Sequence, residues 1–161
     1  MKFKHPSARF PDYGMRGAIE RAHLSHRLKG KLGTLQGHNF SHLTLPKGDL
    51  TNTYFEDCDF SYAKLQGASF DKALTRCLFH GADLRQTIWE GGTDPVAIAE
   101  CEFTSEPRYA TQLAGARFEH AEVTRCLFQD TSLAGVTLVN VTFLHCYIVN
   151  ADFDVDSVII D

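Results

Sequence analysis

Large apolar residues recur at every fifth position over most of this 161-residue chain. Because such residues make up roughly a quarter of the sequence, ten in register by chance is on the order of one in a million per reading frame. The second half holds the period without a break, at Leu113, Phe118, Val123, Phe128, Leu133, Leu138, Phe143, Ile148, Phe153 and Val158. The first half shows it at Leu35, Phe40, Leu45, Leu50, Phe55, Phe60, Leu65 and Phe70 and, after a shift, at Leu74, Phe79, Leu84 and Trp89.

A small residue stands two places before most of these large ones. Examples are Cys58, Ala63 and Ala68 in the first half, and Ala116, Ala121 and Cys126 in the second. The repeating pattern is therefore small-x-large-x-x, with polar residues common at x.

Neither regular secondary structure can use a period of five. Five residues of α-helix rotate by about 500°, which leaves successive large residues about 140° apart. Five residues of a β-strand move the side chain to the opposite face, because the strand period is two. The chain must therefore turn a corner once per repeat, and four corners close a square coil of about twenty residues. Within each short side, the small and the large residue both face inward.

The sequence resembles the pentapeptide-repeat proteins, whose motif reads Ala-Asp/Asn-Leu-x-x. The matching segments are Ala82-Asp83-Leu84, Gly48-Asp49-Leu50, Ala151-Asp152-Phe153 and Cys58-Asp59-Phe60. The resemblance covers roughly residues 33–160. It implies an all-β fold, a right-handed quadrilateral β-helix, with rungs about 4.8 Å apart. About six coils would form a rod roughly 30 Å long.

The two halves of the repeat region look like copies that differ by one residue. Residues 63–70 match 111–118 at an offset of 48, and residues 74–79 match 123–128 at an offset of 49. One residue is therefore missing between Phe70 and Leu74, which predicts a tightened corner there.

Two turn-rich segments interrupt the period, near residues 90–97 and 104–110. Gly, Pro and Asp favour turns, so both segments are predicted to leave the coil as loops. Loops on a rigid scaffold often carry function, although a repeat protein also tolerates functionless insertions. The candidate partner-binding residues are Gly91, Gly92, Asp94, Pro95, Pro107, Arg108 and Tyr109.

The two ends of the chain differ in character. Residues 1–32 fit the period poorly and carry a net charge of +6, and we expect a basic cap there, partly helical around residues 15–28. Residues 33–161 form the predicted β-helix, with a net charge of −2 over 33–90 and −8 over 91–161. No segment that would cap the coil can be recognised in the sequence at the C-terminal end, so we expect that this end can pair with a second molecule as a homodimer.

The side chains that could take part in catalysis or bind a metal do not form a recognisable catalytic, metal or cofactor site. Cys58, Cys77, Cys101, Cys126 and Cys146 all occupy the small inward position, where a free cysteine packs as a small hydrophobe. His42, His80, His120 and His145 fall at outward positions, away from the cysteines. A nucleophile and its base must lie within hydrogen-bond reach, so we predict no catalytic residues, no metal ligands and no cofactor. Trp89 stands at a large-residue position and is predicted to fill the core.

These observations favour a protein that works through its surface. The leading hypothesis is a non-catalytic interaction module or scaffold with a protein partner, since members of the resembled family look like scaffolds, regulators or bacterial effector domains. The alternative is a DNA mimic that binds a type II topoisomerase, DNA gyrase, as other members do; it needs acidic residues aligned in stripes. With no apolar run of membrane-spanning length and no secretory signal, we expect a cytoplasmic protein, or one delivered to a host cell if it is an effector.

Overall fold

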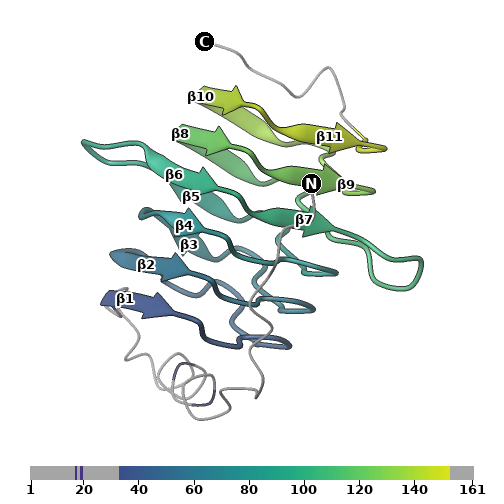
Figure 1. Ribbon diagram of the computed structural model, residues 1–161, viewed down its shortest axis with the longest axis horizontal. Helices are drawn as coiled ribbons and strands as arrows, with labels where there is room; N and C mark the ends of the chain where they lie inside the picture. The colour runs from purple at the N-terminus through teal and green to yellow at the C-terminus, as the bar shows by residue number, and fades with distance from the viewer. Residues whose placement is uncertain (1–16, 18, 20–32, 153–161) are drawn as a thin grey trace.

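The computed structural model of the protein describes residues 17, 19 and 33–152. Over 33–152 the chain winds into a four-sided coil of short strands with turns at the corners (Figure 1). The strands are β1 (Gly33–Gln36), β2 (Thr53–Glu56), β3 (Ser69–Phe70), β4 (Leu74–Thr75), β5 (Ile88–Glu90), β6 (Val96–Ala99), β7 (Glu102–Thr104), β8 (Arg117–Thr124), β9 (Leu127–Gln129), β10 (Thr137–Leu144) and β11 (Tyr147–Val149).

Parallel pairing between successive rungs builds four faces. Face 1 carries β1, β2, β4, β6 and the second halves of β8 and β10, and face 2 carries β7, β9 and β11. Face 3 is joined by isolated parallel bridges such as Thr44 to Lys64 and Lys64 to Asp83. Face 4 carries β3, β5 and the first halves of β8 and β10. The fold is the predicted right-handed quadrilateral β-helix, and the six strands of face 1 agree with the expected six coils.

The corners are made by residues with left-handed backbone angles. Fourteen non-glycine residues have positive φ, from His42 (φ 60) to Asn150 (φ 51), and each stands two places after a large inward residue. Eight of the fourteen are Asn, Asp or His, the non-glycine residues that accept this region best. The fifth residue of each repeat therefore turns the chain, which is why a period of five gives flat sides and square corners.

The inward residues stack in columns that run the length of the rod. On face 2, Phe79 lies 5.0 Å from Phe103 with an interplanar angle of 2°, and Phe103 lies 4.7 Å from Phe128 at 1°. On face 4, Trp89 is fully buried and stacks on Phe70 at 4.2 Å. The prediction that Trp89 fills the core is confirmed. These columns are the hydrophobic core, and they hold successive rungs together.

Register shifts are confined to a few corners. On face 1, Leu35 pairs with Phe55 twenty residues on, whereas Phe55 pairs with Leu74 after only nineteen. The tightened corner predicted between residues 70 and 74 is present. Leu74 then pairs with Ile98, and Ile98 with Val123, across 24 and 25 residues, because the segments around 90–95 and 104–110 add length at single corners. The twenty-residue spacing returns with Val123 and Phe143.

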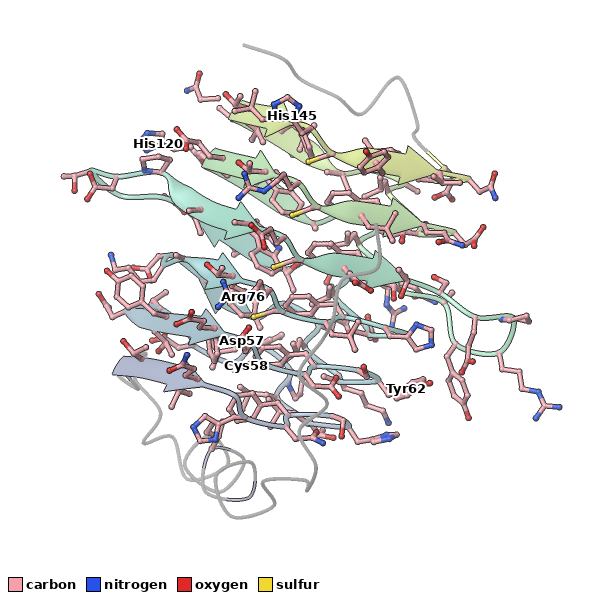
Figure 2. All side chains as sticks on the ribbon, in the orientation of Figure 1. Asp57, Cys58, Tyr62, Arg76, His120 and His145 are labelled. Carbon is pink, nitrogen blue, oxygen red and sulfur yellow. The ribbon has the colours of Figure 1, made fainter. Side chains whose placement is uncertain are left out.

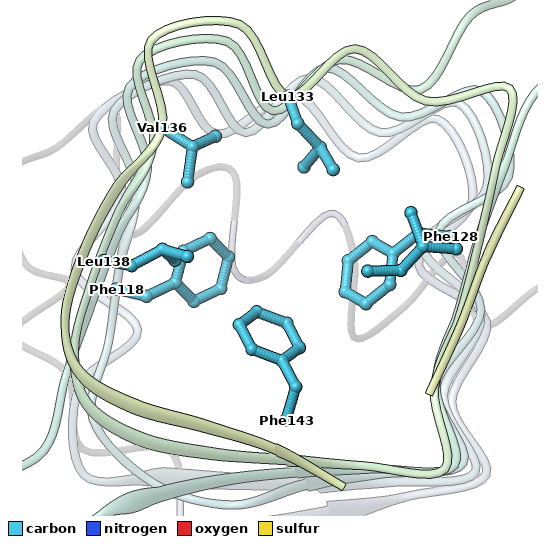
Figure 3. Close-up of a pocket in the computed structure, with 7 residues that line it drawn as sticks. Phe118, Phe128, Leu133, Val136, Leu138 and Phe143 are labelled. Carbon is cyan, nitrogen blue, oxygen red and sulfur yellow. The ribbon is translucent and has the colours of Figure 1, made fainter. Parts of the chain in front are cut away.

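The solvent exposure of inward side chains increases toward the C-terminal side of the described region. Phe128 and Leu133 are 3% and 5% exposed, Leu138 is half-buried, and Phe143 is 36% exposed although it points into the tube (Figure 3). The prediction of buried large residues therefore holds for the inner rungs and fails for Phe143, because no described rung lies above it.

The basic cap predicted for residues 1–32 falls almost entirely outside the described residues. Gly17 and Ile19 are helical, and Ile19 is 2% exposed and belongs to the hydrophobic core cluster. Among the described residues, no helix is long and apolar enough to cross a membrane.

Candidate functional site

Within residues 33–152 the interior of the coil is filled by stacked side chains, and no binding chamber is described there. At its open end a small apolar hollow is left among inward side chains, and its volume of about 10 Å³ holds at most one water. Buried polar groups have partners: the Trp89 indole Nε1 donates to Thr87 Oγ1 at 2.8 Å, and that hydroxyl donates to the Leu84 carbonyl at 2.7 Å. Any site must therefore lie on the exterior. The residues around the hollow are Phe118, Phe128, Leu133, Val136, Leu138, Phe143 and Ile148 (Figure 3).

All five cysteines are free thiols stacked along one corner, between faces 1 and 2 (Figure 2). The sequence pattern placed them inward but did not predict one continuous column, because the extra residues at 90–95 shift Cys101 out of the regular spacing. Each thiol bonds to a carbonyl of the preceding rung, as Cys126 Sγ does to Ile98 O at 3.3 Å. Burial raises the pKa of the Cys101 thiol, and the neighbouring thiols of Cys126 and Cys77 raise it further. Within the part of the chain that the structure describes, no cluster of metal-ligating side chains occurs.

The segment 104–110 leaves the coil between faces 2 and 3 and is held firmly against it. Glu106 and Tyr109 bond to each other through their backbones, closing a tight turn. At its base, Thr111 Oγ1 donates to the carbonyl oxygens of Phe79 at 2.8 Å and Thr104 at 2.5 Å. Pro107, Arg108 and Tyr109 are exposed at the tip, with Tyr109 at 54%.

This turn completes an aromatic cluster that we call the Tyr62 corner: His42, Tyr62, His80, Glu106 and Tyr109. Tyr62 packs edge-on against Tyr109 with ring centroids 5.1 Å apart and against His80 at 5.5 Å, and His42 stacks on it at 5.1 Å. The Tyr62 hydroxyl donates to Glu106 Oε1 at 3.0 Å, and His80 Nε2 lies 3.8 Å from Glu106 Oε2. Partial burial raises the pKa of Tyr62, and its hydrogen bond to Glu106 adds to the rise.

Gly81 makes the Tyr62 corner possible. A Cβ at this position would lie 2.8 Å from Tyr62 Cδ1 and 2.9 Å from Tyr109 Cβ, and the φ of +61° also favours glycine. The two tyrosines therefore approach each other across a residue that has no side chain. The sequence pattern placed His42 and His80 outward and put Tyr109 in a loop, but it did not bring them together with Tyr62. The available signal was that His42 and Tyr62 stand twenty residues apart at the same repeat position.

The segment around 90–95 leaves the coil between faces 4 and 1, and Gly91 fixes its root. A Cβ at Gly91 would lie 2.4 Å from the His120 carbonyl oxygen, whereas one at Gly92 would meet nothing within 4 Å. Gly91 N donates to Glu119 O at 3.0 Å, and His120 Nδ1 lies 3.1 Å from Gly92 O. Gly92 and Asp94 are exposed and Pro95 is half-buried. Beside the loop lies an open hollow of mixed character, lined by Thr51, Ser69, Phe70, Asp71, Ile88, Glu90, Gly91 and Gly92.

The two predicted loops project from opposite corners of the square, as Figure 1 shows on either side of β6 and β7. They share no pocket in the described structure. The candidate residues therefore form two separate groups, with Gly91, Gly92, Asp94 and Pro95 on one side and Pro107, Arg108 and Tyr109 on the other.

Charged residues alternate along the corner between faces 1 and 2. Successive rungs place Asp57, Arg76, Glu100 and Arg125 there, with basic side chains paired to acids of the rung below. Arg76 bonds to Glu56 and, at 2.6 Å, to Asp57 Oδ1. Arg125 Nη2 lies 2.7 Å from Glu100 Oε1. This corner is therefore electrically balanced.

Face 4 carries a short acidic column in three successive rungs, at Asp71, Glu90 and Glu119. Arg117 pairs with Glu119, which reduces its charge at one end. At the corner between faces 1 and 2, by contrast, the acids Asp57 and Glu100 are paired with arginines.

A right-handed, four-sided β-helix with a turn at every fifth residue defines the class of pentapeptide solenoids. Residues 39–74 match the family described as pentapeptide repeats, as eight copies. In this segment the chain is similar to pentapeptide-repeat proteins.

Several solved structures are similar to the chain at low identity. One is trypsin-treated QnrB1 (R167E), a plasmid-mediated fluoroquinolone resistance protein, at 15% identity and TM-score 0.32, covering 76% of this chain and 71% of that one. Another is HetL, involved in heterocyst differentiation regulation in the cyanobacterium Nostoc sp. strain PCC 7120, at 17% identity and TM-score 0.32, covering 74% and 63%. A third is Rfr23 from the cyanobacterium Cyanothece 51142, at 16% identity and TM-score 0.23, covering 83% and 87%. No curated protein sequence matches the chain.

Proposed function

We propose that this protein is a non-catalytic interaction module that binds a protein partner through the Tyr62 corner. The observation that carries the proposal is the combination of a filled interior with one ordered aromatic cluster on the outside. Tyr109 exposes 54% of its surface while Tyr62, Gly81 and Glu106 hold the turn that bears it. Aromatic residues and arginine dominate the energetic centres of protein interfaces, and a turn that is already ordered costs little entropy to bind.

The residues at the tip suit a partner that offers an apolar pocket with a carboxylate beside it. Tyr109 supplies a ring with a polar end, and Arg108, next to it, is exposed and able to pair with an acid. The rod beneath provides rigidity, since its backbone is fixed by pairing between rungs. As part of this proposal the protein works in a reducing compartment such as the cytoplasm, because all five cysteines are free thiols.

The test is affinity capture from lysate of the source organism with three immobilised proteins. They are the wild type, the double variant Arg108→Ala/Tyr109→Ala, and the control Tyr54→Ala, which removes a 47% exposed tyrosine from face 1. We expect the wild type and the control to retain the same partner and the double variant to lose at least ~10-fold of it, since one interface anchor contributes about 2 kcal/mol. Equal capture by all three proteins would contradict the proposal.

DNA mimicry toward a type II topoisomerase is the competing function. Its support is the acidic column on face 4, at Asp71, Glu90 and Glu119. The balanced corner between faces 1 and 2 weighs against it, because a mimic of duplex DNA needs continuous negative charge. A gyrase supercoiling assay with excess protein separates the two: our proposal expects neither inhibition nor protection, and a clear effect abolished by Glu90→Gln/Glu119→Gln would favour mimicry.

A further inference from the structure

Cys126 and Cys146 are the last two thiols of the column at the corner between faces 1 and 2, where the sulfur atoms are yellow in Figure 2. Cys126 lies between β8 and β9, and Cys146 lies at the same place one rung later, between β10 and β11. Pairing fixes this register on both sides, because β10 is paired with β8 up to Leu144 and β11 with β9 from Tyr147. The two cysteines are therefore direct neighbours on successive rungs.

This register brings the two thiols within bonding reach of each other. Residues directly opposite on neighbouring parallel strands have Cα atoms about 4.8 Å apart, inside the ~4.4–6.8 Å range of disulfide-bonded cysteines. The two side chains already interact, since the Cys126 thiol is the main cause of the raised pKa of Cys146. The Cβ atoms of a disulfide lie ~3.5–4.5 Å apart, so the upper rung must approach its neighbour by less than ~1 Å. No described rung lies above residues 137–152 to oppose that shift.

Access to solvent distinguishes this pair from the other neighbouring thiols of the column. Cys58, Cys77, Cys101 and Cys126 are fully buried, whereas Cys146 is half-buried. An oxidant must reach one thiol before a disulfide can form. The second thiol then attacks the oxidised sulfur from inside the protein and need not be exposed. The pair therefore combines one thiol that an oxidant can reach with one buried thiol in position to resolve the oxidised product.

We propose that Cys126 and Cys146 form a site of reversible oxidative modification, at which a peroxide converts the two thiols into a disulfide between adjacent rungs. Cys146, as the thiolate, attacks one oxygen of hydrogen peroxide and breaks the O–O bond, which gives a sulfenic acid and hydroxide. The hydroxide takes up the proton that the thiol had lost and becomes water. The Cys126 sulfur then attacks the Cys146 sulfur, the S–O bond breaks, and the hydroxyl leaves with the Cys126 proton as a second water.

The disulfide fixes the last described rung to the rung before it. In the reduced protein this contact is made by strand pairing and by backbone hydrogen bonds such as that from Tyr147 N to Cys126 O at 2.9 Å. A covalent link between residues twenty positions apart restricts both local opening and the unfolded chain. Exchange with a small thiol reverses the reaction. The site lies at a different corner from the Tyr62 corner, and the inference is independent of the proposed function.

The experiment treats the reduced full-length protein with hydrogen peroxide, alkylates the remaining thiols and maps the peptides by mass spectrometry. We expect one link within the chain, from Cys126 to Cys146, with the other three of the five cysteines still thiols. A dithiol reductant should restore all five. The rate of linking should rise with pH, because the Cys126 thiol and partial burial raise the pKa of Cys146.

Two variants separate this pair from the rest of the column. Cys126→Ser should abolish the link and leave Cys146 as a sulfenic acid, which a cyclic diketone traps as a stable adduct. The matched control is Cys58→Ser, which removes a buried thiol at the other end of the column and should leave the link unchanged.

Hydrogen exchange supplies a second measurement that does not depend on the variants. In the oxidised wild type, the amides of β11 should exchange at least ~10-fold more slowly than in the reduced protein, with those of β2 unchanged. Oxidation of Cys146 to a sulfinic acid while Cys126 stays a thiol would overturn the proposal. A link between two chains, or links formed equally fast among all five cysteines, would overturn it too. So would the absence of any reaction at a peroxide concentration that fully oxidises glutathione.

Discussion

The middle rungs and the last described rung (residues 137–152, called the open rung below) are built from the same repeat, yet their inward side chains differ in exposure. Phe103 and Phe143 both occupy the large inward position, and one is 0% exposed while the other is 36% exposed. Cys101 and Cys146 both occupy the small inward position, and only the first is fully buried. In a solenoid each repeat contacts only the repeats beside it. Burial is therefore supplied by the adjacent rung rather than by the residue itself.

The sharpest test of this comparison is thiol reactivity. Cys146 is partly buried and should react with a thiol reagent after local opening of the open rung. Cys58, Cys77, Cys101 and Cys126 should react only on global unfolding. Since global stability is typically at least ~5 kcal/mol, the rates should differ by a factor of ~10³ or more.

Mass spectrometry after timed labelling measures the order in which the five thiols react. Because the neighbouring Cys126 thiol and partial burial raise the pKa of Cys146, its labelling rate should still be rising above pH 9. Simultaneous labelling of all five cysteines would contradict the contrast between the two regions.

The next largest effect is expected from truncating matched phenylalanines. Phe103→Ala removes a ring stacked between Phe79 and Phe128 and should lower the free energy of unfolding by about 3–5 kcal/mol. Phe143→Ala should cost less than half as much, because its ring is 36% exposed and no described rung lies above it. Urea denaturation of both variants gives the values, and equal costs would show that the open rung is covered within a single chain.

Adjacent glycines provide a smaller contrast of the same kind within one loop. Gly91→Ala forces a Cβ against the His120 carbonyl and should destabilise the protein by about 1–3 kcal/mol. Gly92→Ala meets nothing within 4 Å and should change stability by less than ~0.5 kcal/mol. Thermal unfolding of the pair distinguishes a loop fixed at its root from one that is free along its length; two neutral substitutions would rule out the fixed root.

The smallest effects are expected for the ion pairs between rungs. Arg76 bonds to two acids and Arg125 to one, with side chains 41% and 51% exposed. Exposed pairs contribute about 0.2–1 kcal/mol, so Arg76→Ala should lie near the upper limit and Arg125→Ala near the lower one. Both differences should shrink in 1 M salt. A loss of stability that does not depend on salt would instead indicate that packing of the arginine methylene groups is responsible.

The repeat made most of the fold predictable from sequence. The period of five identified the inward positions, the corners and the shortened turn before Leu74, because each follows from the spacing of side chains along one chain. The Tyr62 corner was not predicted, since it depends on Tyr109 folding back across Gly81, a contact between segments without a fixed spacing. The full cysteine column was also missed: the segment around 90–95 displaces Cys101 in sequence but not in space.

The corner between faces 4 and 1 has a consequence for how such rods diversify. It carries one residue fewer before Leu74 and extra residues before Val96, while the strands on either side keep their pairing. Chain length at a corner is thus decoupled from the spacing of the rungs. New binding segments can be gained or exchanged at a chosen height along the rod, and the distance between two such segments is set by the number of rungs between them.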